Sequence, residues 1–309
     1  MNSILIVGVE SIAGAGLATA LSSTHRVTGI SSVAGIALCN CRIAQLNSTS
    51  AATIEQQIQS ISPDRIIFCG KASRSSWDHR TTKDGFDDAL AVDWASAAAR
   101  HDIDFALISS DAVFSGPWMS HSETDEHFNS NEACMRLRRI EDAVLQAFPK
   151  SLIVRTNVFG WSPCRSEQGF AEQLLDEIQS GLVERVDFIR HASPVLATDL
   201  GTLIEKAFDA EIHGALHLAG AERLSPYQFA ERLCAAADQS APIIPDESLI
   251  SSLSSGQDRR ETTLDCSAAR ELLGVSMPLL EDGLTRFLAQ QPDRTESNSV
   301  ARVSVAGAA

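Results

Sequence analysis

Two glycines six residues apart follow the first apolar run of the chain. The run is ILIVG at 4–8, and the turn reads Gly8-Val9-Glu10-Ser11-Ile12-Ala13-Gly14. A tight turn into a helix offers free N–H groups and the positive end of the helix dipole, and both favour a phosphate group. Gly8 suits the tight turn and Gly14 close helix–strand packing, while Ser11 stands in the middle, where backbone would approach the phosphate. Glu10 adds a charge that opposes a pyrophosphate.

A second polar stretch follows the strand pattern FALIS at 105–109. It reads SSDAVFSG at 109–116 and SETDEHFNSNEACMRLRRIEDA at 122–143. Ser110 offers a hydroxyl and Asp111 a carboxylate. The helix that follows has Ala133 and Leu137 four residues apart, which places them on one face, one turn from each other. Neither can donate a proton, and the chain contains no Tyr-x-x-x-Lys.

This block resembles the catalytic block of the extended short-chain dehydrogenases, in the dTDP-4-dehydrorhamnose reductase branch that reduces keto groups on nucleotide sugars. That branch reads roughly STDYVFDG, then E-x-D, then N-x-Y-G-x-S-K-L-x-G-E. The positions that agree without a gap are Ser109, Ser110, Asp111, Val113, Phe114, Gly116, Glu123, Asp125, Asn131 and Glu141. The likeness extends over about residues 4 to 288.

In such enzymes a hydride passes between nicotinamide and a sugar carbonyl, and Tyr hands a proton to the oxygen. Tyr normally titrates at about 10, so it needs an adjacent Lys to work at neutral pH. The resemblance implies that Ser110 is the retained catalytic residue, which hydrogen-bonds the carbonyl. Ala133 and Leu137 occupy the Tyr and Lys positions. Because positioned acid–base groups contribute about 10² to 10⁴-fold, we expect the ordinary ketoreduction to be lost.

Other groups near this block have plainer interpretations. His127 is expected to be an exposed loop histidine, although a His can act as an acid near neutral pH. Cys134 is expected to be a packing residue. The charged residues Arg136, Arg138, Arg139, Glu141 and Asp142 predict a solvated or subunit-contacting helix face, with phosphate recognition as the alternative.

The resemblance also implies a nicotinamide cofactor, NADP or NAD, although several of the family's cofactor-binding residues are replaced here. The predicted cofactor contacts are Gly8, Ser11, Ile12, Gly14, Asn47, Cys69 and Gly70. Asn47 lies where the family has an Asp beside the adenine. Cys69 and Gly70 lie in a segment of small residues that would admit a ribose or the nicotinamide. The second strand ends in Ser31-Ser32, with neither an acid for a ribose 2′-hydroxyl nor an Arg for a 2′-phosphate. Lys71 is interpreted as a solvated loop lysine, with a phosphate contact as the alternative.

Three residues are predicted to contact a nucleotide-sugar substrate. Asp111 belongs to the block above, and Asn157 stands where an aromatic residue of the family often meets the substrate. Arg260 matches a segment in which an Arg can reach a nucleotide diphosphate. By contrast, His217 and the sole tyrosine, Tyr227, fall in segments that look structural.

The elements that must position these residues alternate regularly. Strand patterns at 4–8, 26–30, 65–69, 105–109 and 152–155 alternate with helical patterns at 13–21, 54–61, 89–101 and 136–147. Such alternation predicts an α/β fold, a Rossmann-like doubly wound parallel sheet. We expect a mainly dinucleotide-binding domain at 1–160 and a smaller, interwoven substrate lobe at 161–290. Residues 291–309 are expected to form a disordered tail.

Composition narrows the classes of partner. The 309 residues carry a formal charge of −15, which argues against binding to nucleic acid or to anionic membranes. The apolar fraction of 44% suits a soluble globule, and the chain starts directly with a strand and has no run of transmembrane length. Seven cysteines lack any CxxC pair or metal-ligand spacing, so reduced thiols, no metal site and a cytoplasmic protein are expected.

Three functions stay open on this basis. The first is a non-catalytic or regulatory protein that binds NAD(P) and/or a nucleotide sugar, and acts through a protein partner or as a homodimer. The second is an active NAD(P)H-dependent reductase of a 4-keto-6-deoxy nucleotide sugar whose proton comes from water, the substrate or a relocated side chain. The third is a structural partner without a small-molecule ligand. Parallel changes at Ser11, Asn47 and the end of the second strand favour the first.

Overall fold

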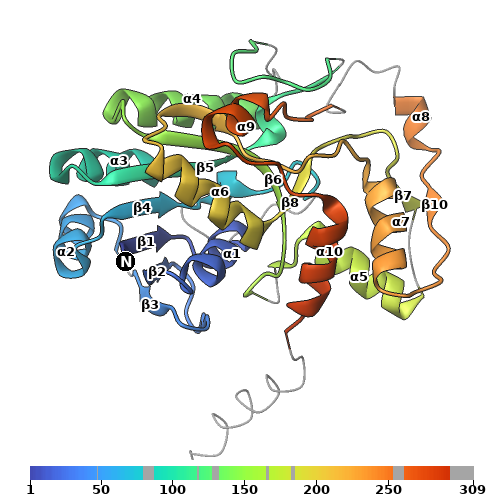
Figure 1. The fold of residues 1–309 in the computed structure, drawn as a ribbon, viewed down its shortest axis with the longest axis horizontal. Coiled ribbons are helices and arrows are strands. Elements are labelled where there is room, and N and C mark those ends of the chain that lie inside the picture. Colours follow the sequence, from blue (N-terminus) through green and yellow to red (C-terminus); the bar gives the residue numbers. More distant parts are fainter. Residues whose placement is uncertain are drawn as a thin grey trace, which may run out of the picture.

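A computed structural model gives the structure of the chain (Figure 1). It describes residues 1–46, 48–78, 87–116, 118–126, 132–164, 167–181, 185–252 and 261–292. The expected tail therefore lies almost wholly outside the described residues. No helix among the described residues is long and apolar enough to cross a membrane.

A parallel sheet forms the centre of the molecule, in the order β3-β2-β1-β4-β5-β6-β8, with β9 also paired to β6 (Figure 1). Its strands are β1 Ser3–Val7, β2 Arg26–Ser31, β3 Arg42–Gln45, β4 Arg65–Phe68, β5 Asp104–Ser110, β6 Leu152–Phe159, β8 Pro194–Leu196 and β9 Gly214–His217. Every described pairing in this sheet is parallel. The predicted Rossmann-like α/β fold is confirmed.

Helices cover both faces of this sheet (Figure 1). One face carries α1 (Ile12–Leu21) and α6 (Ala197–Asp209), and the other carries α2 (Ala51–Ile61), α3 (Leu90–His101) and α4 (Glu132–Ala147). Successive residues of β1 alternate between the two cores: Ile4 and Ile6 belong to the first, Leu5 and Val7 to the second. This period of two explains why a strand buried on both faces reads as a continuous apolar run.

Side-chain caps and left-handed residues set the ends of several helices. Ser50 caps α2 by accepting from the Thr53 N–H, and Ser62 ends the helix at a φ of +47° just before a proline. Ser225 forms a capping box with Gln228 at the start of α7 (Pro226–Ala236).

A third core lies beside the sheet, on the right in Figure 1. It joins α5 (Phe170–Ser180), α7 and α10 (Leu280–Ala289) through an aromatic cluster in which Phe229 packs edge-on against Trp77, Phe159 and Phe170. The remaining elements are β7 Arg185–Val186, β10 Ile244–Pro245, α8 Leu249–Ser252 and α9 Ser267–Leu273. The domain boundaries drawn from the sequence stay a prediction.

Two short strands of the central sheet, β3 and β8, are absent from the sequence prediction, as are β7 and β10 outside it. β3 has only four residues, and its burial pattern is exposed or intermediate throughout, so it lacks the apolar run that marks its neighbours.

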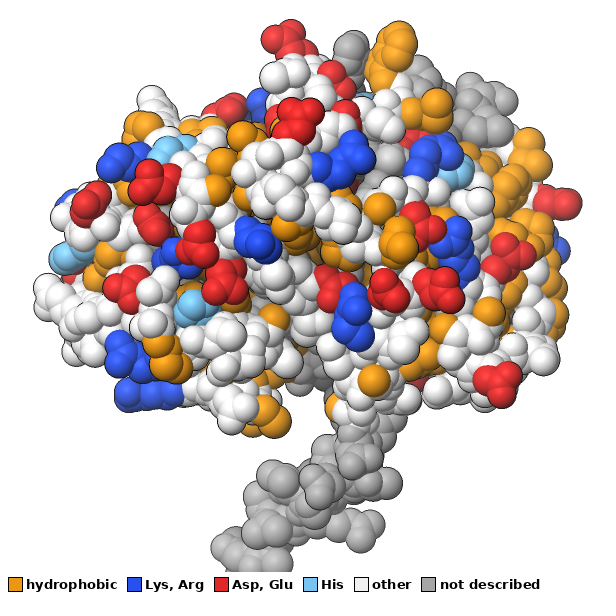
Figure 2. Space-filling view, viewed as in Figure 1, with side chains coloured by type: hydrophobic (Ala, Val, Ile, Leu, Met, Phe, Trp, Pro, Cys, Tyr) orange, Lys and Arg blue, Asp and Glu red, His pale blue; other side chains and the backbone are white. Residues whose placement is uncertain are grey.

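At the surface, acidic and basic side chains are interspersed on the face shown in Figure 2.

Candidate active site

The glycines of the first turn serve close packing of backbone against backbone. Gly8 has a φ of +90°, and a Cβ at this position would lie 1.9 Å from the Cys69 carbonyl oxygen. A Cβ at Gly14 would lie 2.2 Å from the Gly8 carbonyl oxygen. Both positions therefore exclude any side chain, as the spacing indicates.

Ser11, in the middle position of the motif, is the N-cap of α1. Its Oγ accepts from the Gly14 N–H at 3.0 Å and donates to the Gly8 carbonyl at 2.8 Å. The hydroxyl thus satisfies one of the helix N–H groups that a phosphate could otherwise take. Ile12, the next residue, packs against Gly169 at the start of α5, where a Cβ would lie 2.4 Å from its Cδ1.

Glu10 lies against the residue that follows β2. Its Oε1 accepts from the Ser32 hydroxyl at 2.6 Å and from the Ser32 N–H at 3.3 Å. The side chain is only 5% exposed, and Oε2 has no hydrogen-bond partner within the described part of the chain. Burial and then the charge of Glu10 raise the pKa of the Cys69 thiol. β2 has no acidic residue at its end, but the carboxylate of Glu10, from the turn after β1, lies there.

A narrow cavity lies at this turn, and we call it the phosphate-turn cavity. Four of the predicted cofactor contacts line it, namely Ser11, Ile12, Cys69 and Gly70, together with Glu10, Lys71, Arg74, Asp78 and Glu167. Its volume of about 30 Å³ is close to that of one water molecule. Arg74 and Glu167, which both line it, form an ion pair of 3.3 Å.

The hydrogen-bonding groups around this cavity suit a dinucleotide, but the cavity is too small to hold one. The α1 N-terminus, Lys71 and Arg74 suit the two phosphates, and the orphaned Glu10 oxygen suits a ribose hydroxyl. A dinucleotide is far larger than this cavity of about 30 Å³, so the lining side chains must move before one can enter.

A larger cavity of about 590 Å³ lies beyond Arg74, and we call it the Ser110 cavity. The Ser110 hydroxyl donates to the Arg74 carbonyl at 2.6 Å and accepts from the Ala112 N–H at 3.1 Å, so it caps the short 3₁₀ turn at 111–113. Its proton must turn away from that carbonyl before it can polarise a substrate. The catalytic role of Ser110 stays a prediction.

Asp111 and Asn157 lie behind the wall of the Ser110 cavity, and both are 0% exposed. The Asp111 carboxylate accepts from Asn157 Nδ2 at 2.8 Å and from the hydroxyls of Ser76 and Thr262, each at 2.6 Å. Burial raises the pKa of Asp111, against the effect of these donors. Ser76 and Thr262 themselves line the cavity, so Asp111 and Asn157 position the two side chains that a ligand would meet.

Four basic residues line the Ser110 cavity, together with the acidic Asp78, Asp88 and Glu132. Lys71, Arg74, Arg136 and Arg190 all line it. Arg136 also contacts buried Asp88 at 3.3 Å. The alternative interpretations of Lys71 and Arg136, as phosphate contacts, thus gain support from their positions.

Two carboxyl groups in this cavity hold their protons more tightly than usual. Burial raises the pKa of Asp78 to about 6, with Arg74 opposing and Asp111 adding to the shift. Burial also raises the pKa of Asp88 to about 6, against the N–H of Ala72 and the charge of Arg136. Asp78 lines both cavities and therefore lies between the cofactor turn and the substrate side.

Helix α4 carries Ala133 and Leu137, which are predicted to occupy the Tyr and Lys positions of the family. Leu137 lines the Ser110 cavity and packs against the first core, and Ala133 is in the first turn of the helix. Cys134 is 5% exposed, which confirms its packing role. The prediction of a solvated charged face is wrong for Glu141, which is 1% exposed. It lies on the same face as Leu137, four residues earlier, and this face packs against the sheet.

Several predicted residues lie outside the described part of the chain, namely Asn47, His127, Asn131 and Arg260. The sequence also gives no signal for Ser76, Asp78, Arg190 or Thr262. Their contacts join residues far apart in the chain, as between Thr262 and Asp111, so no local spacing could reveal them. None of the seven cysteines, all of which are described, forms a disulfide. His217 is a buried residue of β9, as expected. No cluster of potential metal ligands occurs among the described residues.

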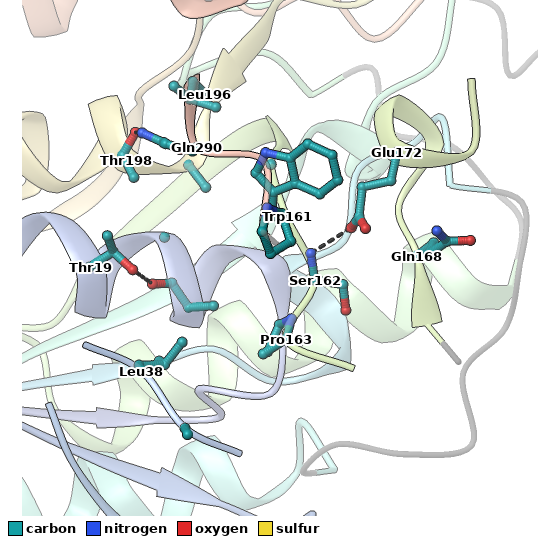
Figure 3. Close-up of a pocket in the computed structure, with 16 residues that line it drawn as sticks. Thr19, Leu38, Trp161, Ser162, Pro163, Gln168, Glu172, Leu196, Thr198 and Gln290 are labelled. Carbon is teal, nitrogen blue, oxygen red and sulfur yellow. Dashed lines mark hydrogen bonds between the residues drawn. The ribbon is translucent and has the colours of Figure 1, made fainter. Parts of the chain in front are cut away.

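A third cavity, of about 640 Å³, lies between α1, α6 and the end of α10 (Figure 3). Its polar groups bond within the protein: Thr19 donates to the Ala15 carbonyl, and the Ser162 N–H donates to Glu172 (Figure 3). This cavity holds none of the predicted site residues.

A family model described as the RmlD substrate binding domain matches residues 1–292. The chain belongs to this family. The match spans both the sheet and the lobe of α5, α7 and α10, so RmlD-type architecture extends over nearly all described residues.

Similar proteins come from archaea and bacteria. The probable low-salt glycan biosynthesis reductase Agl14 of Haloferax volcanii is 25% identical over 263 residues, 82% of this chain and 86% of Agl14. The NADP complex of dTDP-4-dehydrorhamnose reductase from Bacillus anthracis has a TM-score of 0.72 at 20% identity, with 94% of this chain and 99% of that one covered. The NAD⁺ complex of the Bordetella bronchiseptica enzyme WbmH has a TM-score of 0.72 at 17% identity, with 94% and 98% covered.

Proposed function

We propose that this RmlD-family protein binds a nucleotide sugar in the Ser110 cavity, beside a nicotinamide dinucleotide at the phosphate turn, without Tyr- and Lys-dependent ketoreduction. The observation that carries the proposal is the set of cations Lys71, Arg74, Arg136 and Arg190 around a cavity that Leu137 also lines. The resemblance assigns Leu137 to the position of the catalytic Lys. Arg and Lys recognise phosphate oxygens, and a diphosphate needs several such donors.

The missing proton donor supports a non-catalytic or regulatory role. The chain has one tyrosine, and Tyr227 lies on α7, where its hydrogen bond to Glu231 raises its pKa. It does not line the Ser110 cavity. The nicotinamide complexes of the bacterial neighbours support the cofactor part of the proposal. A protein partner, a homodimer and a cytoplasmic location stay predictions from the sequence.

The nucleotide-sugar part is tested by calorimetric titration with dTDP and a dTDP-hexose. Arg136→Gln removes a cation from the cavity, and Arg139→Gln removes an exposed arginine from the same helix outside it. A charge-assisted hydrogen bond is worth about 1.5–3 kcal/mol, so Kd should rise at least about tenfold in Arg136→Gln and stay unchanged in Arg139→Gln. Equal effects of the two variants, or no heat with either ligand, would refute this part.

A second candidate function is active reduction with Asp78 as the proton donor. Asp78 lines both cavities, and a carboxyl group whose pKa is about 6 still holds a proton part of the time near neutral pH. Reduction of a 4-keto-6-deoxy nucleotide sugar with NADH or NADPH should then fall as pH rises through about 6. Asp78→Asn should lower the rate about 10²-fold or more. No turnover by the native protein from pH 5 to 8 would exclude this candidate and leave the first.

A further inference from the structure

We infer that Glu10 selects the dinucleotide whose adenosine ribose has a free 2′-hydroxyl, so that the protein prefers NAD to NADP. The inference rests on the dinucleotide part of the proposed function. It concerns a residue that stands inside the phosphate turn, not at the end of the second strand.

The position of the Glu10 carboxylate is the first step. In dinucleotide-binding sheets an acid about 20 residues after the glycine turn, at the end of the second strand, bonds the ribose 2′-hydroxyl. Here Ser32 stands at that end. It donates both its hydroxyl and its N–H to Glu10 Oε1, at 2.6 and 3.3 Å. Ser32 thereby fixes a carboxylate at the place where β2 supplies none.

The second oxygen of that carboxylate is the next step. Glu10 is 95% buried and lines the phosphate-turn cavity, and its Oε2 has no hydrogen-bond partner within the described part of the chain. A buried carboxylate oxygen without a donor is a strong acceptor whose desolvation is uncompensated. A ribose hydroxyl supplies the missing donor.

A 2′-phosphate meets the opposite chemistry at this point. It carries a charge of about −1.5 to −2, so it repels a buried carboxylate, and it has no hydrogen to donate to Oε2 when ionised. None of Ser31, which ends β2, and Ser32 and Val33, which follow it, is basic. Lys71 and Arg74, which line the same cavity, suit the diphosphate that NAD and NADP share and do not discriminate between them.

The same contacts predict how the site opens. The cavity of about 30 Å³ must widen, and Arg74 and Glu167, which both line it, form an ion pair. Glu10 is held by Ser32 and not by Arg74, so it keeps its position when Arg74 turns toward a phosphate.

Fluorescence titration with NADH and NADPH tests the inference on the full chain. The native protein should bind NADH at least about tenfold more tightly than NADPH. Glu10→Gln keeps the shape and removes the charge, so it should weaken NADH binding and bring the ratio of the two Kd values toward one. Ser32→Ala frees the Glu10 carboxylate and should also reduce the ratio, which provides a second test if Glu10→Gln does not fold.

Each contrary result has its own meaning. Equal or tighter binding of NADPH by the native protein, or an unchanged ratio in both folded variants, would overturn the role of Glu10. Binding of neither dinucleotide would overturn it as well, while calorimetric binding of dTDP-hexose would still support the nucleotide-sugar part of the proposed function. Loss of both dinucleotide and dTDP-hexose binding would refute the proposed function itself.

Discussion

Oε2 of Glu141 lies 2.8 Å from Nη2 of Arg155, and both side chains are buried. Ser109 donates to Oε1 of the same carboxylate at 2.6 Å, and Arg138 donates to Oε2 at 3.0 Å. The pair joins α4 to β5 and β6, and so fixes the helix that carries Ala133 and Leu137. Ser109 and Glu141, which agree with the reductase block, therefore serve to hold α4 against the sheet.

Removal of one partner of this pair should be costly. Glu141→Ala leaves the Arg155 guanidinium buried without its counter-charge, and it should lower the free energy of unfolding by about 3–5 kcal/mol. Urea denaturation measures the loss. Asp142→Asn, on the same helix but exposed, is the matched control and should change stability by less than about 0.5 kcal/mol. Similar losses in both variants would mean that the buried pair contributes little.

The loss of stability caused by a steric clash at the first turn can be measured separately from the loss caused by a positive φ. Gly8→Ala adds both a Cβ clash with the Cys69 carbonyl and a positive φ, and it should destabilise by at least about 3 kcal/mol. Gly35→Ala has a similar φ of +81° but nothing within 4 Å, so it should cost only about 1–2 kcal/mol. The difference in thermal midpoint between the two variants measures the clash. Equal midpoints would argue against close packing of the turn on β4.

His217 should make the fold sensitive to acid. Burial and the neighbouring Arg155 lower its pKa from 6.5 to about 3. The unfolded chain therefore binds this proton first, and stability is lost as pH falls from 6.5 toward 3, by about 1.4 kcal/mol per pH unit. His217→Gln should flatten this part of the stability curve. An equally steep curve in the variant would assign the acid sensitivity to other groups.

Restoration of the two missing groups tests whether the pocket still supports reduction. Ala133→Tyr with Leu137→Lys returns a proton donor and the cation that lowers its pKa. Turnover of a 4-keto-6-deoxy nucleotide sugar with NADH should rise about 10²-fold or more above the native level. Ala133→Phe with Leu137→Lys, which lacks the hydroxyl, is the control. Equal activity of the two double variants would show that the cavity no longer positions a substrate for this chemistry.

The main elements of the fold follow from local patterns in the sequence. Apolar runs such as ILIV at 4–7 predict buried strands, and the helical patterns between them predict the crossovers of a parallel sheet. Short elements escape this reasoning, because β3 has four partly exposed residues and no apolar run. The absence of any Tyr-x-x-x-Lys is also visible in the sequence, and the resemblance to the reductase block assigns the two positions to Ala133 and Leu137.

Side-chain partners across the chain were decided only by the tertiary structure. The sequence places Glu10 in the phosphate turn and Ser32 after the second strand, but parallel pairing of β1 with β2 brings the two side chains together. Asp111, by type a ligand contact, is enclosed by Asn157 and Thr262, 46 and 151 residues away. Local spacing fixes which groups one element presents, whereas burial and contact depend on how separate elements pack. For this protein the sequence therefore determined the parallel sheet and the absence of a Tyr-x-x-x-Lys motif. The packing decided which polar groups face the cavities.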